Sequence, residues 1–100
     1  IDIDRLRREV SAGKKPLRIT THAQIEAAKE GLLLADLRYV FEKGQVIEEY
    51  PQRRRVLLYA EVPGVNVPVH IVVEDAMHEG VIVAAYIPGR ALWYRGRRRK

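Results

Sequence analysis

The sequence predicts an α+β domain in which two to three N-terminal helices pack on a four-stranded antiparallel sheet. Two observations carry this prediction: apolar residues recur at helical spacing up to residue 43, and strand-forming residues dominate from residue 45 onward. The expected strands follow one another through short connections, which is typical of an antiparallel meander. Because the helices precede the strands, we expect them to cover one face of the sheet.

The first and third helices each show one apolar stripe. We expect the first over residues 1–12, followed by Gly13, with a stripe made of Ile3, Leu6 and Val10. We expect the third over residues 34–43, closed by Gly44, with a core face made of Leu34, Leu37, Val40 and Phe41. Nothing at Leu33 can cap the start of this third helix, so its stability should depend on packing.

The second helix, expected over residues 22–30, carries the first candidate site residue. Thr21 and Gln24 form a capping box before it, and Gly31 provides its end. His22 would then be the first helical residue, close to the positive end of the helix dipole. The core face of this helix is predicted to consist of Ile25, Ala28 and Leu32, beside a polar stripe of His22, Glu26 and Lys29.

All four strands of the sheet are expected after residue 44, and they belong to the same single domain as the helices. They are predicted at residues 45–50, 56–62, 67–73 and 81–86. Before the second helix, residues 17–20 are expected to be short and extended. Residues 90–95 are predicted to form a turn or a short helix that carries Trp93. The single α+β domain would thus span residues 1–94, with residues 95–100 as a basic C-terminal tail.

Composition excludes several classes of protein. The chain has no cysteine, so it has neither disulfides nor thiolate metal sites, and a reducing cytoplasm is compatible with it. No apolar run is long enough to span a membrane, and no secretory signal is present. Three scattered histidines do not form a metal site, so we expect no metal and no cofactor. Because the chain begins at Ile1 rather than methionine, we expect an upstream piece to have been removed.

The net charge of +5 comes from the tail. Residues 95–100 hold five of the 18 basic side chains, which leaves 13 basic and 13 acidic residues in the rest of the chain. A block of like charges is usually a solvated extension, and it can also bind the phosphates of a nucleic acid. The sequence leaves both interpretations open.

Several short motifs follow one another in a distinctive order. They are Thr-His-Ala at residues 21–23, then a glycine and Asp36, the segments 44–51, 67–73 and 81–88, and Trp93. Over about residues 17–94 this arrangement resembles a small bacterial family, domain of unknown function 4258, which is similar to the toxin ribonucleases of the RelE, barnase and colicin-nuclease superfamily. The resemblance implies two helices on a four-stranded antiparallel sheet, in a small cytoplasmic protein that cleaves or binds RNA. It also implies an antitoxin partner, of the zinc-finger type for some members.

One departure from the family concerns the helix that follows Thr-His-Ala. The family usually has arginines at the positions that Glu26 and Glu30 occupy here, which leaves Lys29 as the only cation on that helix. A glutamate repels the phosphate that an arginine would stabilise. Either another cation takes this role or the chain is not an active nuclease.

Metal-independent RNA cleavage needs a base, an acid and cations around the phosphate. Under the toxin-like interpretation, His22 would be the general base or a phosphate anchor, His70 its acid–base partner, and Lys29 a charge stabiliser. Four further residues would bind the substrate, the basic ones through phosphates and the aromatic ones by lining the site. These are Arg54, Arg55, Tyr50 and Tyr86.

Each of these assignments has a structural alternative. His70 lies on the open face of the sheet if Val69, Ile71 and Val73 face the helices, and it is packed inside if they do not. His22 is otherwise a surface residue bonded to a backbone carbonyl, and the arginines at 53–55 are otherwise a solvated hairpin. The competing function is a non-catalytic module that binds a protein partner, or a second copy of the chain, through an edge strand.

Overall fold

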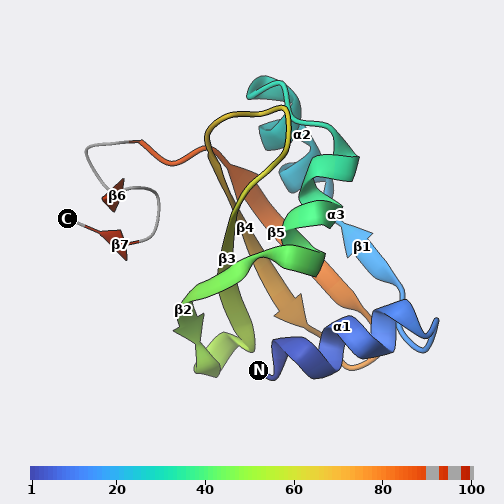
Figure 1. Cartoon of the computed structure of the whole chain (residues 1–100). Helices are drawn as coiled ribbons and strands as arrows, with labels where there is room; N and C mark the ends of the chain where they lie inside the picture. Colours follow the sequence, from blue (N-terminus) through green and yellow to red (C-terminus); the bar gives the residue numbers. More distant parts are fainter. Residues whose placement is uncertain (90–92, 95–97, 100) are drawn as a thin grey trace.

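A five-stranded mixed sheet forms the centre of the molecule, with the strand order β1-β5-β4-β3-β2 (Figure 1). The structure is a computed structural model that describes residues 1–89, 93, 94, 98 and 99, the last four by their backbone. The sheet strands are β1 (Leu17–Ile19), β2 (Gln45–Tyr50), β3 (Arg55–Glu61), β4 (Pro68–Asp75) and β5 (Gly80–Tyr86). The other elements are α1 (Ile3–Ser11), α2 (Thr21–Lys29), α3 (Leu34–Lys43), the 3-10 turn η1 (Pro51–Arg53), β6 (Trp93–Tyr94) and β7 (Arg98–Arg99). The α+β class predicted from the sequence is confirmed.

The prediction of a four-stranded antiparallel sheet is wrong by one strand. Residues 17–20, expected only to be extended, supply β1, which pairs in parallel with β5. Strands β2 to β5 are antiparallel neighbours in chain order, as expected. A strand of three residues is too short to show either helical or strand periodicity. The sequence therefore could not reveal that β1 pairs with β5.

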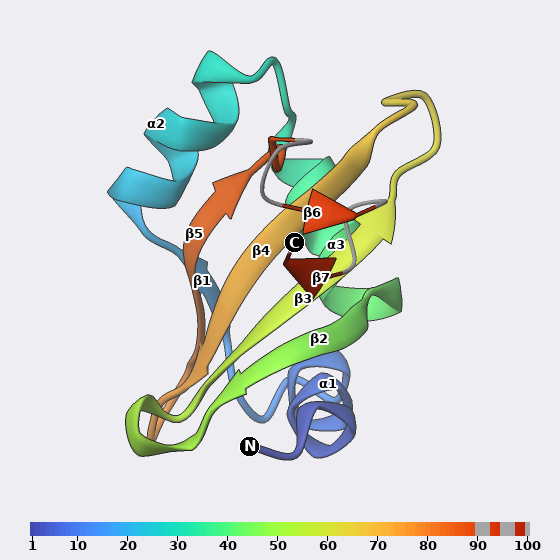
Figure 2. The ribbon, with the colours of Figure 1, turned by 90° about the vertical axis from the view of Figure 1, so that its left-hand side faces the viewer.

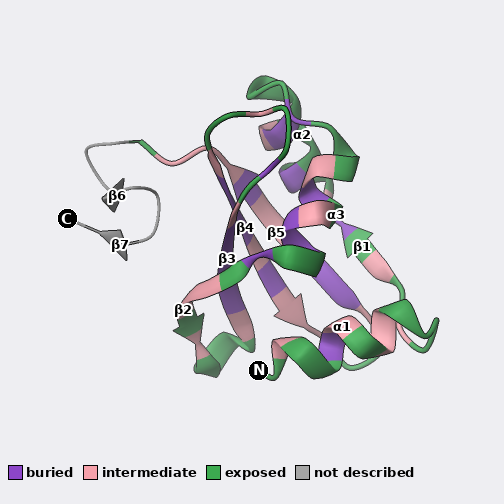
Figure 3. Cartoon of the chain, in the orientation of Figure 1, coloured by how far each residue is buried: buried purple, intermediate pink, exposed green. Residues whose placement is uncertain are grey.

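The helices cover one face of the sheet, as predicted (Figure 1). On that side β4 contributes Val69, Ile71 and Val73 to a core shared with all three helices. We call the opposite side the outer face. Figure 2 looks onto the outer face and shows β6 and β7 in front of β3 and β4. Buried residues run along the central strands β3, β4 and β5 (Figure 3).

The first helix is joined to the end of the third by one arginine. Asp2 caps α1 by accepting a hydrogen bond from the backbone N–H of Arg5 at 3.0 Å. From the same helix, the guanidinium of Arg7 donates to the carbonyl oxygens of Phe41 at 2.7 Å and Gly44 at 2.6 Å. These carbonyls lie at the end of α3, where helix acceptors lack intrahelical partners. Arg7 therefore holds α1 against α3.

The second helix begins one residue earlier than predicted and turns a different face to the core. Thr20, and not Thr21, is the cap, because its Oγ1 accepts from the N–H of Ala23 at 3.1 Å. The buried residues of α2 are Ala23 and Ala27, and Leu32 after the helix is buried as expected. The predicted core residues Ile25 and Ala28 are exposed. Small alanines let a helix approach a sheet closely, which explains why they, and not the isoleucine, face β5.

The third helix has the predicted bounds and a cap that sequence analysis missed. The carboxylate of Asp36 accepts a hydrogen bond from the backbone N–H of Leu33 at 2.8 Å, one half of a capping box. Leu37, Val40 and Phe41 are buried as predicted, whereas Leu34 is 44% exposed. Gly44 follows the helix with an extended backbone, and only glycine fits there because a Cβ would clash with the carbonyl oxygen of Val40.

The end of the chain is described only in part. The backbones of Trp93–Tyr94 and Arg98–Arg99 pair as antiparallel strands, so the predicted turn or short helix is wrong at Trp93 and Tyr94. The remainder of residues 90–95, the packing of the Trp93 side chain and the rest of the basic tail lie outside the described residues. Among the described residues, no helix is long and apolar enough to cross a membrane.

Candidate functional site

The imidazole of His70 lies on the outer face, between two tyrosines. Because Val69 and Ile71 point toward the helices, His70 points away from them, which is the first of the two alternatives given above. The side chain is nevertheless fully buried, with 0% exposed. Its ring centroid lies 5.4 Å from that of Tyr86 and 6.5 Å from that of Tyr59. The strand register places these three residues in one row across β3, β4 and β5.

The other two predicted catalytic residues lie on α2. His22 is the second residue of the helix, and its Nε2 lies 3.0 Å from Oε1 of Glu26, one helical turn further on. Lys29 lies exposed in the last turn. His70 lies on the outer face, whereas α2 packs through Ala23 and Ala27 on the helix-covered side of the sheet, where His22 pairs with Glu26. The structure therefore does not bring the two imidazoles together.

Two predicted substrate-binding arginines are held by carboxylates at the end of β4. Arg54 has a left-handed backbone, with φ of 53°, and its guanidinium donates to the carbonyl oxygen of Asp75 at 2.8 Å and to its carboxylate at 3.1 Å. Arg55 lies opposite Glu74 across the strand pair and donates to its carboxylate at 2.8 Å. Both charges are thus largely balanced within the chain.

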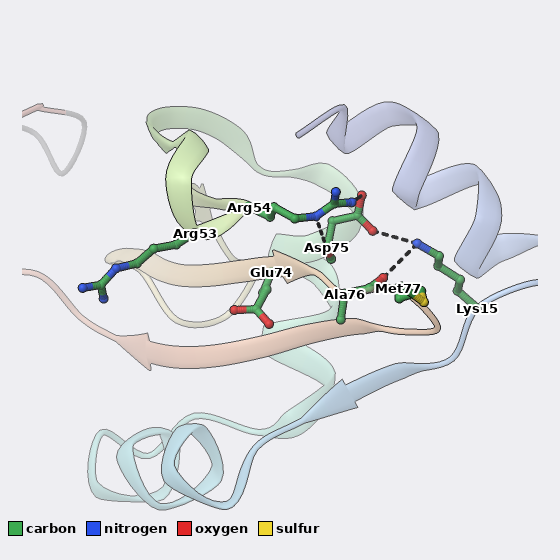
Figure 4. Close-up of a pocket in the computed structure, with 7 residues that line it drawn as sticks. All are labelled: Lys15, Arg53, Arg54, Glu74, Asp75, Ala76 and Met77. Carbon is green, nitrogen blue, oxygen red and sulfur yellow. Dashed lines mark hydrogen bonds and ion pairs between the residues drawn. The ribbon is translucent and has the colours of Figure 1, made fainter.

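A lysine that sequence analysis did not single out completes this network. The ammonium group of Lys15 donates to the carboxylate of Asp75 at 2.8 Å and to the carbonyl oxygen of Ala76 at 3.1 Å (Figure 4). Around these groups lies a pocket of about 430 Å³, which we call the Lys15 pocket. The residues that line it include Lys15, Arg53, Arg54, Asp75, Ala76 and Met77.

A larger pocket of about 670 Å³ lies at the end of β2. We call it the Tyr50 pocket, and its lining includes Glu49, Tyr50, Pro51, Arg53, Arg55 and Val72. The hydroxyl of Tyr50 donates a hydrogen bond to the carboxylate of Glu48, which holds the ring in place. The structure thus brings together Tyr50 and Arg55, two of the four predicted substrate-binding residues. Arg54 lines the neighbouring Lys15 pocket, and Tyr86 lies beside His70.

Arg53 is the functional candidate that sequence analysis missed. It lines both pockets, and within the described part of the chain its guanidinium makes no hydrogen bond or ion pair. Figure 4 shows its side chain extended away from the cluster around Asp75. The sequence carried no signal for this choice, because which of three consecutive arginines meets a carboxylate depends on the pairing of β3 with the end of β4. The residue in the turn is the one whose charge remains available to a ligand.

The family comparison covers most of this arrangement. A family model described as domain of unknown function (DUF4258) matches residues 19–87. The chain belongs to this family. No curated protein and no solved structure matches the chain.

The DUF4258 segment contains both pockets except for Lys15, and it contains the whole of α2, α3 and β2 to β5. It leaves out α1, β6 and β7. Among the described residues of this DUF4258 protein, no three histidine, aspartate or glutamate side chains lie together in a way that could hold a metal ion.

Proposed function

We propose that this DUF4258 domain is a toxin-like protein that acts on RNA without a metal, and that RNA contacts the Tyr50 pocket. The observation that supports this most is Arg53, an exposed guanidinium that lines this pocket with Tyr50 and has no partner among the described residues. A guanidinium suits a phosphate because it offers several donors in a plane. An aromatic ring offers a surface on which any base can stack.

The geometry supports RNA binding better than cleavage. None of His22, His70 and Lys29 lines the Tyr50 pocket. His70 is fully buried and His22 is paired with Glu26. If cleavage occurs, His22 remains the proposed base and His70 its proposed partner, with Lys29 as the cation. A protein of this kind would act in the cytoplasm and be controlled by an antitoxin partner.

A pair of arginine variants tests RNA binding. We expect Arg53→Gln to weaken the binding of a mixed single-stranded RNA and to lower the slope of log affinity against log salt by about 0.7, because one phosphate contact is lost. The matched control is Arg38→Gln, which removes a charge that is also exposed, on α3 and outside both pockets. Fluorescence anisotropy over a salt series measures both. Equal affinities of the two variants would contradict the proposal.

RNA integrity in the presence of a chelator tests cleavage in the same samples. A catalytic protein should shorten the RNA, and His22→Ala and His70→Ala should each leave it intact. If the wild type leaves the RNA intact while binding it, the domain is an RNA-binding protein and not a nuclease.

The second candidate function is a non-catalytic module that binds a protein partner. Three large apolar side chains on α2 and around the start of α3 favour it: Ile25 is 50% exposed, Leu33 67% and Leu34 44%. Pairing through the β2 edge is less favoured, because this strand carries Glu48, Glu49 and a bulge. A chain that fails to bind RNA in the experiment above would leave this candidate as the better one.

A further inference from the structure

The Tyr50 pocket and the Lys15 pocket meet at one residue. Arg53 lines both of them, at the end of η1, where the chain turns from β2 into β3. The Tyr50 pocket lies on the β2 side of this turn, and the Lys15 pocket lies where the ends of α1, β3 and β4 come together (Figure 4). A ligand that contacts Arg53 therefore has a recess on either side of it.

The two recesses offer different chemistry. The Tyr50 pocket combines an aromatic ring with the apolar side chains of Pro51 and Val72, which suits the flat face of a base. The Lys15 pocket is more polar, and its one large apolar side chain is Met77, which is 81% exposed. A thioether is polarisable and adapts to a flat aromatic group. Each pocket thus presents an apolar surface, with the Arg53 charge between them.

We infer that the ligand is a single-stranded oligonucleotide that places one base in the Tyr50 pocket, its phosphate on Arg53 and the next nucleoside in the Lys15 pocket. This inference rests on the proposed function and adds the strandedness and path of the ligand. It follows from the order of the groups, because a base, a phosphodiester and a second base alternate in the same way along a nucleic-acid strand.

A duplex does not fit this arrangement. Bases in a duplex are stacked and paired, so neither can enter a pocket, whereas the bases of a single strand can be turned outward and stacked on side chains. The same chemistry is present in single-stranded RNA and single-stranded DNA. The experiment therefore includes both kinds of strand.

Binding of adenosine monophosphate and of the dinucleotide ApA to the full chain tests the inference by amide NMR. We expect the monophosphate to shift signals of Tyr50, Gln52, Arg53 and Val72, and ApA to shift those of residues 75–77 as well. ApA should bind about tenfold tighter, since it adds a second stacked base. This increase has no purely electrostatic origin, because ApA carries less negative charge than the monophosphate. A blunt RNA duplex should leave all these signals unchanged.

Two variants test separately the contact with Arg53, which both ligands make, and the Lys15 pocket, which only ApA reaches. Arg53→Gln should weaken both ligands about tenfold relative to Arg38→Gln. Met77→Ser, at an exposed position, should weaken ApA about tenfold and leave the monophosphate unchanged, because the neutral change removes a thioether that only the second nucleoside contacts. The affinity of the deoxy form of ApA shows which nucleic acid is bound. If it equals that of ApA, the protein binds single strands of RNA and of DNA, and if it is lower, the ligand is RNA.

Two outcomes would overturn the inference. If ApA binds no tighter than the monophosphate and shifts only the signals of Tyr50, Gln52, Arg53 and Val72, the second recess is not used, while the proposed function stands. If neither ligand nor longer RNA shifts the signals of either pocket, the inference and the proposed function fail together.

Discussion

Glu79 and Arg18 form an ion pair that joins β1 to the turn before β5. The guanidinium Nε of Arg18 lies 2.8 Å from the Oε1 atom of Glu79. The hydrogen bond and the nearby positive charge lower the pKa of Glu79 below its ordinary value of 4.5, and the same contact raises the pKa of Arg18. This pair lies beside β1, the strand of the five-stranded sheet that the sequence did not predict, so its titration reports on the pairing of β1.

We expect the carboxyl group of Glu79 to titrate below 4.5, and Arg18→Gln to move the midpoint back up. A lowered folded-state pKa means that the pair adds stability above the unfolded-state pKa, and that this stability is lost as the pH falls through the folded-state pKa. A carboxyl NMR titration measures the midpoint. Arg38→Gln is the control. A Glu79 midpoint that is unchanged in Arg18→Gln would show that the pair is not formed in solution.

For single residues, the sequence indicated which side chains were candidates for a site better than it indicated their contacts. It identified a run of three arginines as the main basic cluster of the domain, and the structure shows two of them bound to Glu74 and Asp75. It could not identify Arg53 as the one of these three arginines that has no partner among the described residues, because this depends on which strand ends lie side by side. It also left the orientation of His70 open, since alternation along a strand defines two faces and does not say which one meets the helices.

The end of α2 could be predicted from the sequence, but the face that it turns to the core could not. Its end at Gly31 was predicted and is confirmed by the positive φ of 73°. Its core face was predicted wrongly, because three alanines on nine residues give little contrast between the sides. The contact with β5 selects the side with Ala23 and Ala27, where the helix can come closest.

A matched pair of leucine substitutions on α2 tests this assignment. Ala27 is 1% exposed and Ala28 is exposed, one residue away on the same helix. We expect Ala27→Leu to lower the free energy of unfolding by about 1–3 kcal/mol, because the added atoms have no space against β5. Ala28→Leu should change it by less than about 0.5 kcal/mol. Urea denaturation measures both, and the opposite order would restore the face predicted from the sequence.

The molecule as a whole is larger than its family segment. α1 precedes residue 19, where the match begins, yet Leu6 from this helix is 1% exposed and belongs to the main core. Its Cδ1 atom would lie 3.3 Å from a Cβ placed on Gly80, so helix and strand are in close contact. α1 is therefore part of the folded unit and not an appendage to it.

We expect Leu6→Ala to lower the free energy of unfolding by about 2–5 kcal/mol, a large share of the about 5–15 kcal/mol typical of a domain. The control is Leu33→Ala, which removes the same atoms at a position that is 67% exposed and should cost less than about 0.5 kcal/mol. Thermal or urea unfolding of the full chain gives both values. Similar values for the two variants would mean that α1 is detached in solution.

The pairing of β1 with β5 also affects how the chain folds while it is being synthesised. Thr20 and Val83, which touch in the finished sheet, are separated by 63 residues. A ribosome that adds about 5–20 residues per second needs roughly 3–13 s to synthesise that interval. During this time the first strand of the nascent polypeptide has no neighbour to pair with, and α2 has no β5 to cover. The sheet can close only after β5 has been synthesised, and until then the apolar residues of β1 and α2 that face the core stay exposed.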